Sequence, residues 1–282
     1  MYELAERYDG DIEFGPLMGT PVPAYPETLQ DWADHHKILN FELWNEPDVP
    51  GFFSGYCKDY RELILKPGYR GVKRANRKTS VAGPALAFDP TRTSSGDYLK
   101  NLDYLDCVLQ NGGWDNLDII TIHAYPHESG CCCDNGFYDR IKSFVRPDWA
   151  DGSNYNISIK SIMTVHTYLE KWFRTNGRKE FWITETGSTS DGPLKLPSGK
   201  TMSGMFCLNQ DKQNTFYRGM LNFMDQTRIA EKIFFWTLAD ANIQKSISSS
   251  NEKYVYYGLV DYDRTQKKSA FNTLKSYTEF SE

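Results

Sequence analysis

Five short apolar segments, rich in β-branched and aromatic residues, recur along the chain, and stretches with helical spacing separate them. This alternation predicts βαβ units, because two parallel strands need a long crossover connection that is usually a helix. Right-handed crossovers then place the strands in one parallel sheet. The sequence therefore predicts an α/β fold, with strands expected over residues 38–44, 79–87, 116–126, 179–187 and 232–240.

Helices are expected where apolar residues recur three or four positions apart. Leu99, Leu102, Leu105 and Leu109 show this spacing most clearly, before a Gly-Gly pair that suits a helix end. In the first helical stretch, Pro67 and Gly68 are expected to break or kink the helix. The predicted helical stretches are residues 54–76, 96–113, 159–177, 209–228 and 267–280.

A parallel sheet of this kind either stays open or closes into a barrel. No glycine-rich phosphate loop follows any of the five expected strands, which argues against a nucleotide-binding open sheet. The sequence therefore favours a barrel, with about five βα units recognisable, and a single domain over residues 1–282.

Charge and composition exclude several kinds of partner. The formal net charge is −5 and the densest basic cluster, residues 73–78, suits a solvated helix end, so no nucleic acid is expected. No apolar run reaches the ~18 residues of a membrane span. Residues 1–10 are charged and lack the pattern of a signal peptide.

Six cysteines are present, three of them adjacent at Cys131, Cys132 and Cys133. Zinc ligands usually come in separated pairs, so this spacing argues against a metal site. One or two disulfides in the long loops are compatible with the count. No metal and no organic cofactor is expected.

Polar and aromatic residues gather where the expected strands end. Glu46 follows the first strand, His123 and Tyr125 end the third, Glu185 ends the fourth, and Trp236 lies near the end of the fifth. The carboxyl ends of barrel strands point to one face, where catalytic groups gather. We therefore expect Glu46 and Glu185, which are 139 positions apart, to meet across one pocket.

Two facing carboxyl groups can cleave a glycosidic bond when one is protonated and the other ionised. Each residue also has a purely structural interpretation. Glu185 could favour a helix N-terminus, His123 and Tyr125 could be residues at the edge of the core, and most aromatic residues fill the core. The pairing of two strand-end glutamates favours the catalytic interpretation.

The segments "LWNEPD" and "WITETG" resemble the two signature segments of the clan A glycoside hydrolases, a superfamily of (β/α)8 TIM barrels. The closing stretch "YYGLVDYDRTQKKSAFNTLKSY" is also similar to the end of such barrels. Within the clan, the pattern is most similar to family 39, which includes β-xylosidases and α-L-iduronidase-like enzymes. The resemblance implies a retaining hydrolase of β-linked, xyloside- or glucan-like sugars, and suggests an extracellular location.

Carried over by motif, the resemblance makes Glu46 the general acid/base and Glu185 the nucleophile. Asn45 would then donate to the sugar 2-hydroxyl, and Trp236 would stack on the sugar. Tyr125 would orient Glu185 by a hydrogen bond, and His123 would help to bind substrate.

The chain departs from the clan before Glu46. About three βα units precede the Asn-Glu-Pro strand in complete barrels, whereas 45 residues precede Glu46 here, and residues 1–10 are similar to the helix just before that strand. Five strands cannot close an eight-stranded barrel. A truncated chain, a complementing chain and closure by self-association all stay open. The alternative functions are a non-catalytic carbohydrate-binding relic and a barrel fragment that needs a partner segment.

Overall fold

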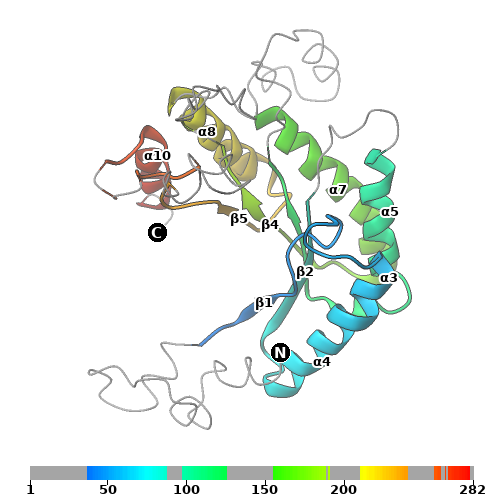
Figure 1. Cartoon of the computed structure of the whole chain (residues 1–282). Coiled ribbons are helices and arrows are strands. Elements are labelled where there is room, and N and C mark those ends of the chain that lie inside the picture. Colours follow the sequence, from blue (N-terminus) through cyan, green and yellow to red (C-terminus); the bar gives the residue numbers. More distant parts are fainter. Residues whose placement is uncertain are drawn as a thin grey trace, which may run out of the picture. The chain divides into compact units, whose positions relative to one another are not determined.

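The computed structural model describes residues 37–87, 97–125, 155–188, 190, 210–240, 257–261, 264 and 266–279. Strands and helices alternate along this part of the chain (Figure 1). The strands are β1 (Asn40–Glu42), β2 (Ser80–Ala87), β3 (Ile119–His123), β4 (Glu180–Thr186) and β5 (Lys232–Phe235). The helices are α3 (Cys57–Asp59), η1 (Tyr60–Leu65), α4 (Lys66–Ala75), α5 (Asp97–Leu109), η2 (Trp114–Asn116), α7 (Tyr155–Asn176), α8 (Gln210–Thr227) and α10 (Ser269–Glu279).

The strands follow one another in a single parallel sheet in the order β1-β2-β3-β4-β5. In the pairing of β1 with β2, Phe41 lies opposite Val81. The predicted α/β class with a parallel sheet is therefore confirmed. Five strands in chain order are consistent with an incomplete barrel, but a complete eight-stranded barrel is not confirmed.

All five predicted strands form within the predicted ranges, although β1 is reduced to three residues. Helix α7 ends at Asn176, before Gly177, whose φ of +86° is the left-handed geometry of a helix end. None of the described helices combines the length and apolar character that a membrane crossing requires. The expected helix at residues 1–10 lies outside the described residues, as do Cys131–Cys133, Cys207 and most of the loops 126–158 and 188–207.

Of the break or kink expected at Pro67, the break does not occur. Helical backbone runs from Cys57 to Ala75, and Pro67 lies in the first turn of α4. The six residues before α4 form a π-helix, η1. Pro67 is the second residue of α4, and a proline is tolerated in the first turn of an α-helix.

The described chain divides into two compact units, and strands β3 and β4 each contribute residues to both. The described residues of the first unit are 37–87, 99–122 and 176–182. Those of the second unit are 97–98, 123–125, 155–175, 183–188, 190, 210–240, 257–261, 264 and 266–279. That the whole chain is one domain stays a prediction.

The first unit packs its helices on the buried faces of β1, β2 and β3. Val72 of α4, Leu105 of α5 and Ile120 of β3 are completely buried, as is Tyr60 of η1. A disulfide joins Cys57 of α3 to Cys107 of α5, with 5.9 Å between their Cα atoms. The sequence placed disulfides in loops, whereas this one links two helices.

The second unit buries the apolar faces of α7 and α8, with Phe216, Tyr217 and Met220 of α8 fully covered. Phe235 of β5 stacks on Tyr217 at 4.5 Å between ring centroids. Burial raises the pKa of the Tyr217 phenol, and Asp240 raises it further, so the phenol stays protonated.

Candidate active site

Glu185 lies on β4, one residue before the strand ends. Its carbonyl oxygen accepts the Ala124 N–H at 2.8 Å, and the Thr186 hydroxyl donates to the Ala124 carbonyl at 2.7 Å. Both bonds tie the end of β4 to the residues that follow β3. The Glu185 side chain, 30% exposed, is therefore presented from a fixed backbone and stays accessible.

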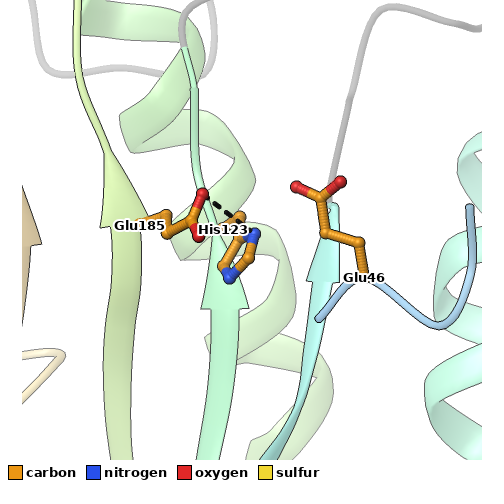
Figure 2. A group of neighbouring side chains, drawn as sticks. All are labelled: Glu46, His123 and Glu185. Atoms are coloured by element: carbon orange, nitrogen blue, oxygen red, sulfur yellow. Dashed lines mark ion pairs between the residues drawn. The ribbon is translucent and has the colours of Figure 1, made fainter. Parts of the chain in front are cut away.

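Two side chains from the end of β3 contact the Glu185 carboxylate. The Tyr125 hydroxyl donates to Glu185 Oε2 at 2.9 Å. His123 Nδ1 lies 3.6 Å from the same oxygen, a contact that becomes an ion pair when the imidazole is protonated (Figure 2). The hydrogen bond from Tyr125 limits the rotation of the Glu185 carboxylate, and His123 lies beside the same oxygen.

His123 and Tyr125 differ in solvent exposure, and this difference affects whether each could contact a ligand directly. His123 is 1% exposed, whereas Tyr125 is only partly buried. A side chain as covered as His123 is better placed to hold Glu185 than to touch a ligand directly. The predicted role of His123 in substrate binding stays a prediction.

Two further aromatic rings, Tyr257 and Trp236, continue from Tyr125 in the second unit. Tyr257 packs edge-to-face against Tyr125 at 5.9 Å and against Trp236 at 5.2 Å between centroids. Trp236 directly follows β5, and its backbone N–H donates to the Thr186 carbonyl at 2.7 Å. The predicted strand-end position of Trp236 is therefore confirmed, and its ring is fixed relative to the end of β4.

Gly187 makes this packing possible, because the backbone of Trp236 passes very close to it. A Cβ on Gly187 would lie 2.3 Å from the Trp236 carbonyl oxygen and 3.2 Å from the Tyr257 ring. Only a residue without a side chain fits at this approach. The glycine in "WITETG" thus has a structural reason that the sequence alone did not supply.

A buried polar cluster joins the segments that follow β4 and β5. Lys268 Nζ donates to Asp240 Oδ1 and to the Ser190 hydroxyl, both at 2.6 Å. The Gly258 N–H donates to the same Asp240 oxygen at 2.8 Å. Sequence reasoning missed Lys268 and Asp240, because nothing in their spacing signals that two charged residues are buried together.

Glu46 belongs to the first unit, in the turn that follows β1. Its N–H donates to the Ala85 carbonyl of β2 at 3.0 Å, and its carbonyl accepts the Val49 N–H at 3.0 Å. Trp44 and Glu46 have positive φ angles of 82° and 45°. Such geometry is rare for residues other than glycine and gathers at functional sites. Asn45 between them is exposed.

Two further residues that the sequence did not single out hold this turn. The Tyr104 hydroxyl of α5 donates to the Pro47 carbonyl at 2.8 Å, and Asp48 Oδ1 accepts the Ala87 N–H at 3.0 Å. Tyr104 is 57 positions away from Pro47. No local pattern could have shown that it reaches the Asn-Glu-Pro turn.

No protein-family model matches the sequence. Over 133 residues the chain is 23% identical to a β-xylosidase of Caldicellulosiruptor saccharolyticus, a match that covers 47% of this chain and 24% of the β-xylosidase. The chain thus spans about a quarter of that relative. Over these 133 residues, the sequence of the chain is similar to that of a glycoside hydrolase.

Solved structures are similar to the chain in fold. The crystal structure of Ruminococcus gnavus β-glucuronidase matches with a TM-score of 0.50 at 14% identity, over 86% of this chain and 32% of the other. A β-galacturonidase from Eisenbergiella tayi matches with a TM-score of 0.48 at 13% identity, over 89% and 34%. At such identity the likeness concerns the fold alone. Membership of clan A and of family 39 stays a prediction.

Proposed function

We propose that this chain carries the catalytic pair of a retaining glycoside hydrolase that acts on β-linked sugars. Glu185 is the nucleophile and Glu46 is the general acid/base. The observation that carries the proposal is the environment of Glu185, an accessible carboxylate at a strand end that Tyr125 and His123 contact through one oxygen. Similarity to a β-xylosidase in sequence supports the class of reaction.

The parallel sheet supports the pairing of the two glutamates. Glu46 follows β1 and Glu185 lies at the end of β4, and the carboxyl ends of parallel strands emerge at one edge. A retaining enzyme uses two carboxyl groups at one anomeric carbon, one as nucleophile and one as acid/base, and we assign these roles to Glu185 and Glu46.

The reaction takes place in two steps, each with a balanced transfer. In the first, a Glu185 carboxylate oxygen forms a bond to the anomeric carbon, the glycosidic bond breaks, and Glu46 gives its proton to the leaving oxygen. In the second, Glu46 takes a proton from water while the water oxygen displaces Glu185. The product keeps the anomeric configuration of the substrate.

The remaining predicted residues take supporting roles in this proposal. Tyr125 and His123 orient Glu185 and stabilise its charge. Trp236, fixed by Tyr257 and by its bond to Thr186, offers a ring face to the apolar side of a sugar. Asn45, exposed beside Glu46, donates to the sugar 2-hydroxyl.

The test is hydrolysis of aryl β-xylosides, β-glucosides and β-glucuronides by the wild-type chain and by single variants. Glu185→Gln is expected to abolish turnover, and Glu46→Gln to lower kcat/KM by about 10²–10⁴ on substrates with poor leaving groups. Glu180→Gln on the same strand and Glu42→Gln on β1 are the matched controls, and both should keep activity. Full activity in either catalytic variant would refute the assignment.

Two signatures separate the roles of the glutamates. NMR of the first product formed should show a retained anomeric configuration. With added azide, Glu185→Ala should yield a glycosyl azide of inverted configuration, and Glu46→Ala one of retained configuration, because azide replaces a nucleophile in the first case and water in the second.

A second candidate function is carbohydrate binding without turnover, by a part of a barrel that needs a further segment. The five-stranded parallel sheet, which is consistent with an incomplete barrel, favours it. Calorimetry that detects sugar binding, together with no hydrolysis of any aryl glycoside, would support this candidate over the first.

A further inference from the structure

We propose that Tyr104 is a positioning residue for Glu46, and that the disulfide between Cys57 and Cys107 holds Tyr104 in place. The proposal rests on the acid/base role that we assign to Glu46. All the residues involved belong to the first unit, within residues 37–87 and 99–122.

The turn that carries Glu46 needs support from outside itself. With φ angles of 82° and 45°, Trp44 and Glu46 occupy a region that side-chain-bearing residues rarely adopt. Such a conformation persists only where the surrounding structure determines it. The turn must therefore be held by contacts with other elements.

The supports come from two directions. Strand β2 contributes the Ala85 carbonyl, which accepts the Glu46 N–H, and the Ala87 N–H, which donates to Asp48 Oδ1. The helices contribute two phenols. Tyr60 of η1 donates to the Leu43 carbonyl at 2.7 Å, before the turn, and Tyr104 donates to the Pro47 carbonyl at 2.8 Å, directly after Glu46.

Tyr104 is suited to donate at any ordinary pH. Burial raises the pKa of its phenol, and the carboxylates of Asp48 and Asp59 raise it further. The hydroxyl therefore keeps its proton. Pro47 has no N–H to donate. Its carbonyl accepts the hydrogen bond from the Tyr104 hydroxyl, and this bond fixes the turn directly after Glu46.

The disulfide anchors the helix that carries Tyr104. Tyr104 and Cys107 are three positions apart on α5, so they lie on neighbouring parts of one helix face. Cys107 is bonded to Cys57 of α3, and Arg61 of η1 donates to the Cys107 carbonyl. One end of α5 is thus fixed to the helices that follow the turn.

The first experiment measures hydrogen exchange and needs no activity. Tyr104→Phe removes the hydroxyl and keeps the ring. The amides of Glu46, Val49 and Ala87 should exchange about twofold to tenfold faster, as expected for the loss of one hydrogen bond. The amide of Ser80, which donates to Leu39, should not change.

Tyr69→Phe is the matched control, because Tyr69 is a half-buried tyrosine on α4 whose ring contacts Lys73. It should leave the exchange of all four amides as in the wild type. Cys57→Ser/Cys107→Ser should reproduce the pattern of Tyr104→Phe. Wild-type exchange at Glu46 and Val49 in Tyr104→Phe would overturn the proposal.

The second experiment asks whether the turn positions the acid. Tyr104→Phe should lower kcat/KM by about threefold to tenfold for aryl glycosides with poor leaving groups. It should leave kcat/KM unchanged for those with very good leaving groups, because kcat/KM reports the first step and their departure in that step needs no proton. An equal loss for both would indicate a structural role and overturn the proposal. If hydrolysis itself is absent, only the assigned function fails, because the exchange experiment still tests the role of Tyr104.

Discussion

At Gly187 the space for a side chain is less than one methyl group. The Trp236 carbonyl oxygen lies 2.3 Å from where a Cβ would be, and it belongs to the backbone, so it cannot swing away. The same approach sets the position of Trp236 relative to β4. The lack of a side chain at a single residue, Gly187, therefore fixes how the aromatic rings of the second unit pack.

We predict that Gly187→Ala lowers the free energy of unfolding by about 1–3 kcal/mol, as overpacking typically does. Chemical denaturation followed by tryptophan fluorescence measures the change. Gly51→Ala is the control, because no atom lies within 4 Å of its added Cβ. Equal stability of the two variants would contradict the close approach.

The buried pair of Lys268 and Asp240 leads to a second prediction at this scale. The two side chains are only 6% and 9% exposed. Lys268→Met would leave Asp240 charged and buried, so it should lower the free energy of unfolding by about 3–5 kcal/mol. Denaturant titration of the purified variant measures the loss.

Two comparisons sharpen this experiment. Lys268→Met/Asp240→Asn removes both charges and should recover part of the stability, because no unpaired charge remains. Arg174→Met, which breaks an ion pair with Glu170 where Arg174 is 81% exposed, should change stability by less than about 1 kcal/mol. A loss for Lys268→Met no larger than that of Arg174→Met would mean that the buried pair does not form.

At the scale of elements, the disulfide is the strongest constraint on the helices of the first unit. It closes a loop with a sequence separation of 50 between Cys57 and Cys107. In the chain-entropy description, a loop of that size corresponds to about 4 kcal/mol of stabilisation. The bond also implies an environment in which thiols are oxidised.

We therefore predict that Cys57→Ala/Cys107→Ala lowers the free energy of unfolding by about 2–4 kcal/mol. Urea denaturation under non-reducing conditions measures it. Adding a reductant should destabilise the wild type by a similar amount and leave the double variant nearly unchanged. A reductant effect of equal size in both proteins would assign the stabilisation to other cysteines.

The helix from Cys57 to Ala75 shows what spacing predicts and what it misses. The apolar spacing predicted helix correctly across this stretch. The break expected at Pro67 does not occur: the backbone stays helical, and Pro67 lies in the first turn of α4, after the π-helix η1. The π-helical hydrogen-bond spacing of η1 accompanies the burial of Tyr60 and Leu65. Such packing cannot be predicted from the local sequence.

At the scale of the whole molecule, an exposed strand edge can promote association between chains. Within the described part of the chain, β1 has one neighbour, β2, and is therefore an edge strand. Leu39 beside it is 50% exposed. An edge with exposed apolar residues is a template for pairing with a further strand.

We predict that the purified chain self-associates in a concentration-dependent manner and that Leu39→Lys weakens this association, because charge on an edge disfavours strand pairing. Sedimentation velocity measures it. Leu63→Lys is the control, since Leu63 is 69% exposed on a helix, and should have little effect. If both variants reduce association equally, general hydrophobicity and not the β1 edge is responsible.

The sequence by itself determined the order and kind of the elements, because apolar periodicity and helix ends are local. It also singled out the strand-end positions of Glu46, His123, Tyr125, Glu185 and Trp236. Whether the two glutamates act as predicted is left to the variants proposed above.

Only the tertiary structure decided which distant residues hold those positions. His123 lies beside the Glu185 carboxylate, Tyr104 reaches Pro47 across 57 positions, and Lys268 is buried against Asp240. Such contacts depend on how elements pack, and packing joins residues whose separation in sequence carries no signal. The hydrogen bond from Tyr125 to Glu185, by contrast, was already expected from the sequence. The local pattern of apolar residues determines where the strands form. The packing of the elements determines which residues contact the ends of those strands.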